Sequence, residues 1–239
     1  MEEQKSNLLS LKLSGMAACL QTLYETRKLN DLSLFDGLQL LIQAEKDQRW
    51  SNRYGRLIKT ANFRYQATLE QLNTSKERGI DAGQINTLAV GSYLKNGESI
   101  LICGCAGVGK SYLASAFGHQ ACRQGYAVAY YNVQKLLNQL KVARLDGSFF
   151  KLMERLAKTD LLILDDFGLT PLDNNQQNDV MELIEDRHAR KSTIIASQLP
   201  ISAWFDVFPE ATIADAILDR IVHTSHRIEL KGESLRKKR

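Results

Sequence analysis

The sequence contains little proline and cysteine, and it has no long hydrophobic segment. Of its 239 residues, three are proline and four are cysteine. No run of roughly 18 or more apolar residues occurs, so we expect no helix that crosses a membrane. The N-terminal sequence MEEQKSNLLSLKLSG lacks the basic start and long apolar core of a secretion signal. These absences favour a cytoplasmic protein.

The cysteines and histidines are too scattered to predict a metal site. Cys103 and Cys105 lie in an apolar, strand-like run, and no pair of cysteines has the CxxC spacing. His223 and His226 are three residues apart, and packing explains them better than metal binding does. This use of cysteine fits a reducing compartment.

What the sequence does contain is typical of a globular protein. Hydrophobic residues make up 44% of the chain and aromatic residues 8%. The length suits one large α/β domain with a small accessory domain. The formal net charge of +4 is mild and by itself says little about a nucleic-acid partner.

The hydrophobic pattern changes near Arg64. Before it, apolar residues recur at intervals of three and four, as in Leu9, Leu13 and Met16, which predicts helices. After it, short apolar runs predict strands at 97–104, 127–132, 161–165, 192–197 and 226–230. Helical patterns lie between them at 110–123, 133–143, 149–158, 175–190 and 211–223. We therefore expect a helical domain over residues 1–64 and an α/β domain with a mainly parallel sheet over 65–239.

A glycine-rich loop follows the first expected strand. The sequence GCAGVGKS matches G-x-x-x-x-G-K-[S/T] between a strand and a helix, which predicts a phosphate-binding loop. Its backbone N–H groups and the helix N-terminus would surround phosphate oxygens, Lys110 would reach the β- and γ-phosphates, and Ser111 would bind Mg²⁺. The candidate nucleotide-binding residues are Gly104, Cys105, Ala106, Gly107, Val108, Gly109, Lys110, Ser111 and Tyr112.

Two adjacent carboxylates end a strand that is expected to be buried. In LLILDDFG, residues 161–168, Asp165 follows four aliphatic residues, and burying its charge is costly unless a cation or hydrogen-bond donors compensate. We expect Asp165 to help hold Mg²⁺ opposite the phosphate loop. Asp166 would polarise the water that attacks the γ-phosphate. The alternative for Asp166 is a carboxylate that only caps the turn before Gly168.

Several segments together resemble one family. GCAGVGKSYLA, YYNVQKLLNQL, LLILDDFGL, STIIASQLP, DAILDRIVHTSHRIEL and KGES are similar to segments of the IstB-like ATP-binding proteins. These are AAA+ helper ATPases of insertion sequences, related to the helicase loader DnaC and the initiator DnaA. The resemblance extends over nearly the whole chain. It implies a parallel αβα sandwich, preceded by a small helical domain, that binds ATP and Mg²⁺.

The resemblance also implies two further catalytic residues. Ser197, with Gln198 as the alternative, matches the polar sensor residue that positions the attacking water. Arg220 matches the arginine finger that one subunit inserts into its neighbour's site, where it neutralises charge on the transferred phosphoryl group. The alternative for Arg220 is a salt bridge within the subunit, to Asp215 or Asp219.

Two features depart from the usual AAA+ pattern. The acidic pair is Asp-Asp rather than Asp-Glu, and the shorter second side chain requires a closer water or slows hydrolysis. The sequence beyond Leu230 is too short for the helical lid domain, although Arg236 is a candidate for a contact of the sensor-2 type.

Basic residues suggest where DNA would bind. Lys46, Arg49, Arg53 and Arg56 recur at helical spacing, Trp50 and Tyr54 are interleaved, and Lys59 and Arg64 extend the run. The alternative is a solvated helix face with Trp50 in a core. By resemblance to the initiator clade, Lys141 and Arg144 would face a central channel. The tail RKKR, residues 236–239, is better explained as a solubilising end than as a specific site.

These features predict an Mg²⁺-dependent ATPase that helps DNA transposition. It would form a ring or helical oligomer with ATP on duplex DNA and recruit or stimulate a transposase. The main alternative is a DnaC-like helicase loader that binds single strands. A small-molecule kinase and an ATP sensor without turnover are further alternatives.

Overall fold

A computed structural model of the chain describes residues 1–235, with Lys76 described by its backbone alone. Two compact units make up the chain: the first comprises Met1–Arg56 and the second begins at Leu57. The boundary between them lies upstream of Arg64, so Arg64 belongs to the second unit. Arg236 and the basic tail lie outside the described residues, so their predicted roles have no structural counterpart here.

The first unit is helical. It contains α1 (Glu2–Ser10), α2 (Ser14–Glu25), a short 3₁₀ helix (Lys28–Asp31) and the greater part of α3 (Leu34–Ala61). The buried Glu45 of α3 accepts hydrogen bonds from the N–H groups of Gly15 (2.7 Å) and Met16 (3.2 Å). Its carboxylate therefore satisfies amides in the first turn of α2, which have no partner within that helix.

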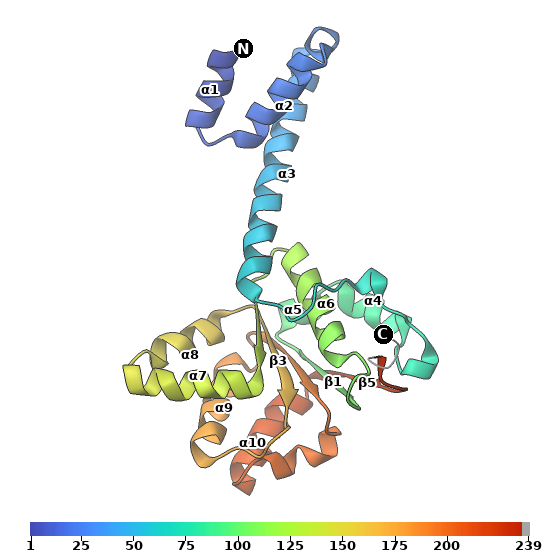
Figure 1. Cartoon of the computed structure of the whole chain (residues 1–239), viewed down its shortest axis with the longest axis vertical. Helices are drawn as coiled ribbons and strands as arrows, with labels where there is room; N and C mark the ends of the chain where they lie inside the picture. The colour runs from blue at the N-terminus through green and yellow to red at the C-terminus, as the bar shows by residue number, and fades with distance from the viewer. Residues whose placement is uncertain (236–239) are drawn as a thin grey trace. The chain divides into compact units, whose positions relative to one another are not determined.

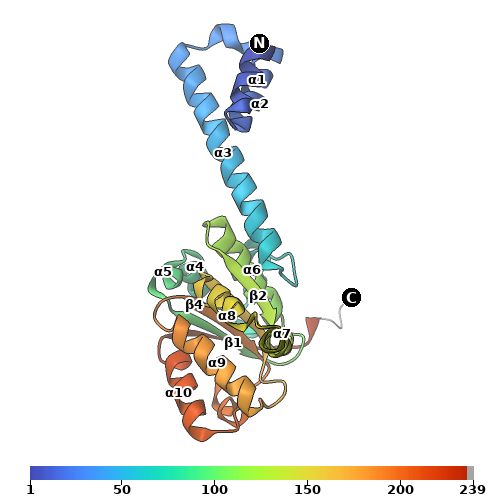
Figure 2. The ribbon, with the colours of Figure 1, turned by 90° about the vertical axis from the view of Figure 1, so that its left-hand side faces the viewer.

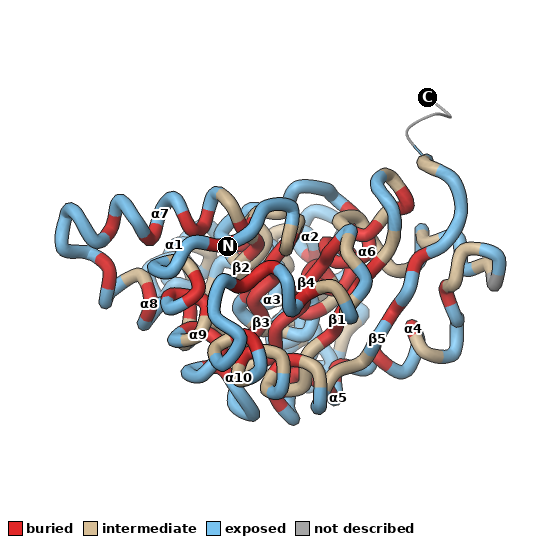
Figure 3. The backbone as a smooth tube through the Cα atoms, turned by 90° about the horizontal axis from the view of Figure 1, so that it is seen from below, coloured by how far each residue is buried: buried red, intermediate tan, exposed pale blue. Residues whose placement is uncertain are grey.

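The second unit is built on a parallel sheet. Its strands are β1 (Ser99–Gly104), β2 (Val128–Asn132), β3 (Leu161–Phe167), β4 (Ser192–Ser197) and β5 (Ser225–Leu230). They lie in the order β2-β3-β4-β1-β5, and every neighbouring pair is parallel. Most strand residues are buried, as the red stretches of tube in Figure 3 show. The predicted α/β fold with a mainly parallel sheet is confirmed.

Helices connect the strands and cover both faces of this sheet. They are α4 (Ala82–Ala89), α5 (Ser92–Asn96), α6 (Lys110–Arg123), α7 (Val133–Asp146), α8 (Phe149–Lys158), α9 (Asn174–Arg187) and α10 (Ala211–Val222). The helices from α7 to α10 pack on one face, where Leu101, Leu162 and Ile195 point toward them. Helix α6 lies on the other face, against Ile163 (Figures 1 and 2). After β5, the described residues form no helical lid.

The sheet brings the glycine-rich loop and the acidic pair to one edge. Strand β4 lies between β1, which leads into the glycine-rich loop, and β3, which carries the acidic pair. In parallel strands the carboxyl ends meet at the same edge, so the loop and the acids converge there. Strand β3 continues to Phe167, past the end expected at residue 165, and its pairing with β4 shifts register between Leu164 and Phe167.

Candidate nucleotide-binding site

The glycine-rich loop has a backbone that side chains would strain. Gly107 and Gly109 have φ angles of 82° and 103°. A Cβ on Gly107 would lie 2.1 Å from Oγ of Ser234, so the C-terminal segment packs directly on the loop. Leu235 N donates to the Gly107 carbonyl at 3.0 Å, and Arg78 Nη2 donates to the Val108 carbonyl at 2.8 Å. These contacts hold the loop in place from outside.

Lys110 is buried within the loop that it follows. Its Nζ donates to the carbonyl oxygens of Gly104, at 2.7 Å, and Cys105, at 2.8 Å. Burial lowers the pKa of Lys110, and the nearby charges of Asp165 and Asp166 oppose that shift. Phosphate oxygens carry negative charge and are stronger acceptors than these carbonyls. The ammonium group is therefore in place to exchange its loop contacts for a nucleotide.

The Asp165 side chain is fully buried, and each of its two oxygens accepts a hydrogen bond. Its Oδ1 accepts from Ser111 Oγ at 3.0 Å, and its Oδ2 accepts from the hydroxyl group of Tyr130. Burial raises the pKa of Tyr130, and the negative charge of Asp165 raises it further. The hydroxyl group therefore stays protonated and remains a donor. Serine and aspartate oxygens are hard ligands of the kind that Mg²⁺ binds.

A metal at this position would depend on the nucleotide for further ligands. Within residues 1–235, no group of three or more His, Cys, Asp or Glu side chains is arranged to hold a metal ion. Mg²⁺ commonly uses one or two protein ligands together with phosphate oxygens and water. The neighbouring oxygens of Ser111 and Asp165 fit that pattern.

Asp166 has an unusual backbone conformation. Its φ angle is +60°, in the left-handed region, where aspartate is tolerated better than most residues. Its Oδ2 accepts a hydrogen bond from Asn132 Nδ2 at 2.9 Å, and Arg64 Nη1 lies 3.4 Å from the same oxygen. Asp166 is therefore a partly exposed carboxylate that Asn132 and Arg64 hold in place.

A cavity of about 580 Å³ lies beside the loop. Lys110, Ser111 and Asp166 line it together with Gln198, and Tyr65 and Leu235 contribute apolar surface. Its size is typical of a small-molecule site. Ser197 is fully buried, and its Oγ donates to the Phe167 carbonyl at 2.7 Å and accepts from Leu199 N at 3.1 Å. Of the two sensor candidates, Gln198 is the one that faces the cavity.

Arg220 points to another part of the second unit. Its Nε lies 2.6 Å from Glu185 Oε2 on α9, and its Nη1 donates to the Ala216 carbonyl at 2.8 Å. The structure thus contains a salt bridge within the subunit, as in the alternative reading, but with Glu185 as its partner instead of Asp215 or Asp219. Within the described residues, the cavity wall beside the loop does not include Arg220.

The basic residues of α3 are exposed. Lys46, Arg49, Arg53 and Arg56 all lie on that helix, and Arg49 Nε contacts Glu45 Oε1 at 2.7 Å. Trp50 is 53% exposed and stacks on Tyr54 with ring centroids 5.4 Å apart. Trp50 therefore lies outside a core, contrary to the alternative that buried it.

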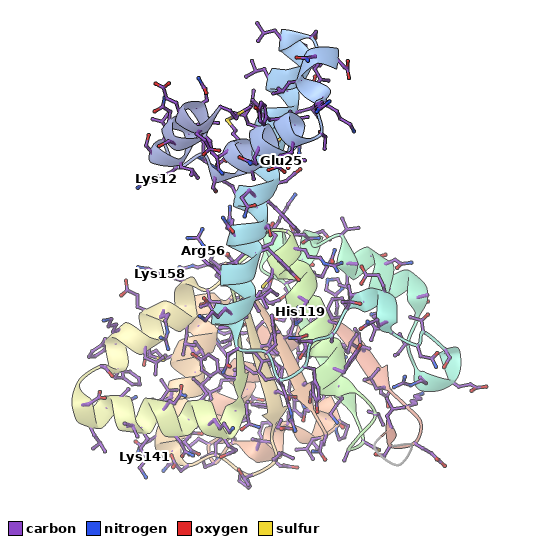
Figure 4. The ribbon with its side chains drawn as sticks, turned by 45° about the horizontal axis from the view of Figure 1, so that its top comes forward. Lys12, Glu25, Arg56, His119, Lys141 and Lys158 are labelled. Carbon is purple, nitrogen blue, oxygen red and sulfur yellow. The ribbon has the colours of Figure 1, made fainter. Side chains whose placement is uncertain are left out.

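The two basic residues on α7 differ in their surroundings. Lys141 is exposed on this helix (Figure 4). Arg144 makes a salt bridge to Asp179 of α9, and its guanidinium carbon lies 3.7 Å from the Phe149 ring centroid. Arg144 therefore also braces α7 against its neighbours.

The sequence alone does not assign three residues to this site: Tyr130, Asn132 and Arg64. Tyr130 and Asn132 could have been found from the pairing of β2 with β3, because that pairing places Asn132 opposite Asp165. Arg64 gave no local signal, because its contact with Asp166 joins residues 102 positions apart.

Comparisons with known proteins show the family to which the chain belongs. The sequence matches the family model described as IstB-like ATP binding protein over residues 6–239. A chain of Sinorhizobium fredii named as an insertion sequence ATP-binding protein is 42% identical over 228 residues, which cover 95% of this chain and 93% of the relative. A chain of Pseudomonas fluorescens named as the ATP-binding protein of insertion sequence IS1162 is 43% identical over 198 residues, covering 82% and 86%.

Solved structures share the fold of the second unit. The crystal structure of the DnaC helicase loader aligns with a TM-score of 0.57 at 20% identity, over 70% of this chain and 98% of that chain. The replication initiator DnaA bound to AMPPCP and single-stranded DNA aligns with a TM-score of 0.59 at 21% identity, over 72% and 52%. Separately, no helix within residues 1–235 has both the length and the apolar character needed to cross a bilayer.

Proposed function

Because this chain belongs to the family of IstB-like ATP-binding proteins and has the AAA+ fold, we propose that it hydrolyses ATP in support of DNA transposition. The ATP-bound chains assemble on duplex DNA in the cytoplasm and recruit or stimulate a transposase at a target site. The observation that carries the proposal is the Ser111–Asp165 contact beside the phosphate loop, with Asp166 facing the same cavity.

Each residue at the site has its own role in ATP hydrolysis. Ser111 and Asp165 would hold Mg²⁺, which would supply positive charge to offset the negative charge of the phosphates. Lys110 adds a second cation, and the loop N–H groups bind phosphate oxygens. Asp166 orients the attacking water and accepts its proton, and Gln198 positions the same water from the next strand. Asn132 keeps the Asp166 carboxylate in place between turnovers.

Arg220 acts in trans in this proposal. It neutralises charge on the transferred phosphoryl group of a neighbouring subunit, which is worth about 10³–10⁵ in rate for arginine fingers. Within its own subunit it contacts Glu185 and leaves the cavity beside the loop to other residues. Supporting this role, its side chain is 27% exposed, so a partner subunit can reach it.

Duplex DNA binds to the exposed stripe of Lys46, Arg49, Arg53 and Arg56, with Lys141 as a further contact. Lysine and arginine side chains on one helix supply affinity that depends on salt and not on base sequence. Replacing Lys46 and Arg53 by alanine is expected to weaken duplex binding uniformly and to flatten its salt dependence. Ser51→Ala, on the same helix, is the matched control.

Target capture with Lys110→Ala tests the whole proposal. Without this ammonium group we expect loss of ATP-dependent assembly on duplex DNA and of transposase recruitment. If Lys110→Ala assembles on duplex DNA as well as the wild type does, and does so without ATP, the proposed mechanism is wrong. A preference for single strands, together with capture of a replicative helicase, would favour a loader instead. Transfer of the phosphoryl group to a small acceptor would identify a kinase.

A further inference from the structure

The segment that follows α3 is fixed to the core of the second unit by an aromatic anchor. The Phe63 ring stacks on His119 of α6 with centroids 4.4 Å apart and meets the Tyr130 ring edge-on at 6.4 Å. A Cβ on Gly118 would lie 2.3 Å from Phe63 Cε1, so only glycine leaves room for this ring. The Tyr65 carbonyl lies 3.2 Å from a ring nitrogen of His119. The residues on both sides of Arg64 are therefore held in place.

This anchoring puts the Arg64 guanidinium beside both acids. Nη1 lies 3.5 Å from Asp165 Oδ2 and 3.4 Å from Asp166 Oδ2, so one nitrogen bridges the two carboxylates. The Arg64 side chain is 42% exposed, whereas the Asp165 side chain is 1% exposed. A half-exposed cation thus compensates a buried anion. Arg64 extends the basic run of α3 in sequence, but in space it faces the nucleotide site.

The same carboxylate is the one assigned to the metal. A divalent cation bound at Asp165 and the guanidinium of Arg64 would repel each other, because both are positively charged and both contact the same carboxylate. Without a divalent cation, the two adjacent carboxylates would repel each other if Arg64 were absent. Arg64 is therefore favoured beside the acidic pair when no divalent cation is bound, and away from it when one is bound.

We propose that Arg64 is an internal counter-cation of the acidic pair, which holds Asp165 and Asp166 while the divalent cation is absent and gives way when metal and nucleotide bind. This inference rests on the proposed function, since it requires the metal site at Asp165. Arg64 lies three residues beyond Ala61, the last residue of α3. An ionic contact therefore joins the residues just beyond α3 to the acidic pair, and binding of metal and nucleotide would release it.

Binding of Mn²⁺ to the full-length protein without nucleotide, followed by electron paramagnetic resonance, tests this role. Arg64→Ala and the longer neutral variant Arg64→Gln are expected to bind Mn²⁺ about tenfold more tightly than the wild type, because a competing positive charge is gone. Arg64→Lys keeps the charge and is expected to bind as the wild type does. Lys59→Ala removes an exposed positive charge from the last turn of α3 and is the matched control.

Thermal unfolding gives a second readout that a purely structural role would not produce. The neutral variants are expected to unfold at lower temperature than the wild type without metal, and Mn²⁺ is expected to raise their Tm more than that of the wild type. Equal Mn²⁺ affinity in the wild type and both folded neutral variants would overturn the proposal. So would an equal gain in affinity in Lys59→Ala.

Asp165→Asn separates this failure from failure of the proposed function. If ATP tightens Mn²⁺ binding and Asp165→Asn abolishes it, the metal site stands, whatever Arg64 does. If Asp165→Asn leaves Mn²⁺ binding with ATP unchanged, the metal site itself is misplaced and the counter-cation role falls with it.

Discussion

Asp166 shows how one backbone angle can select a side chain. The second acid of this pair is a glutamate in most AAA+ proteins, and here the backbone at that position is left-handed, with φ at +60°. Aspartate is tolerated in this region better than glutamate, because its short side chain can bond locally. The strand continues through this residue to Phe167, so the left-handed angle turns Asp166 within the strand. The shorter acid therefore fits its backbone.

Substituting Asp166 separates chemistry from binding. Asp166→Asn is expected to lower kcat for ATP hydrolysis by about 10²–10⁴, because a positioned base is lost, and to leave ATP affinity unchanged. Asp166→Glu is expected to lower the free energy of unfolding by about 1 kcal/mol through the left-handed backbone. Phosphate release, nucleotide titration and denaturant unfolding measure these effects. Hydrolysis by Asp166→Asn at the wild-type rate would remove this residue from the mechanism.

The neighbours Ser197 and Gln198 are expected to respond in opposite ways. Ser197→Ala removes a buried hydroxyl that bonds Phe167 and Leu199, which should cost about 1–3 kcal/mol of stability. Gln198→Ala should leave stability nearly unchanged and lower kcat by up to about 100-fold, because the water is less well positioned. Unfolding curves and steady-state rates on both variants check this division. The reverse pattern would return the sensor role to Ser197.

At the scale of elements, the sequence predicts the strands well, but it does not predict which distant side chains contact each other. The apolar runs marked β1 to β4 within two residues of their observed starts, since strands buried on both faces are continuously hydrophobic. The glycine-rich loop is predicted equally well, because the residues that form it are consecutive in the sequence. The contacts of Arg64 with Asp166 and of Arg220 with Glu185 are not, because they join elements distant in sequence.

Arg187 joins α9 to two other elements through a buried charge. It is 1% exposed, and its guanidinium donates to the carbonyls of Leu156, Thr159 and Ser192 and to Thr193 Oγ1. Burial lowers its pKa to about 10, so it remains charged at neutral pH. Arg187→Met would leave several buried carbonyls without a donor.

We expect Arg187→Met to lower the free energy of unfolding by about 3–5 kcal/mol, because each buried carbonyl left without a donor costs about 1–3 kcal/mol. Chemical denaturation of the full chain measures the loss. The exposed Arg190→Met, which removes a charge near the end of the same helix, should differ from the wild type by less than about 0.5 kcal/mol. Equal effects of the two substitutions would contradict a bracing role for Arg187.

Glu45 makes the packing of α2 on α3 sensitive to acid. The hydrogen bond from Arg49, together with those from the amides of Met16 and Gly15, holds the pKa of Glu45 below its ordinary value of 4.5 despite desolvation. A carboxyl group with a lowered folded pKa stabilises the fold fully above the ordinary pKa, and this contribution is lost as the pH falls through the lowered value.

Hydrogen exchange of α2 in the full chain tests this contribution. At pH 7, Glu45→Gln should exchange faster than the wild type over α2, and the difference should shrink in acid, as the pH falls below the ordinary value of 4.5 and through the lowered pKa of the wild-type side chain. Glu3→Gln, an exposed substitution in α1, should show no difference at either pH. A gap that persists unchanged in acid would mean that the charge of Glu45 is not what stabilises the contact.

At the scale of the whole molecule, the catalytic set is divided between subunits if Arg220 acts in trans. Arg220→Ala and Asp166→Asn should each be inactive alone, for different reasons. Mixed assemblies should recover hydrolysis, because an Arg220→Ala site with its own Asp166 can receive Arg220 from the other variant. Phosphate release from titrated mixtures measures the recovery. Mixtures that co-assemble yet stay inactive would place Arg220 outside the reaction.

The contact of the C-terminal segment with the phosphate loop has a practical consequence for handling the protein. Leu235 N bonds the Gly107 carbonyl, and Ser234 lies against the same glycine. Any sequence fused after Arg239 is therefore attached only four residues beyond a segment that touches the loop. An affinity tag at this end would add bulk and charge to the chain close in sequence to the segment that packs on the loop. Nucleotide affinities measured with such a tag and after its removal are expected to differ.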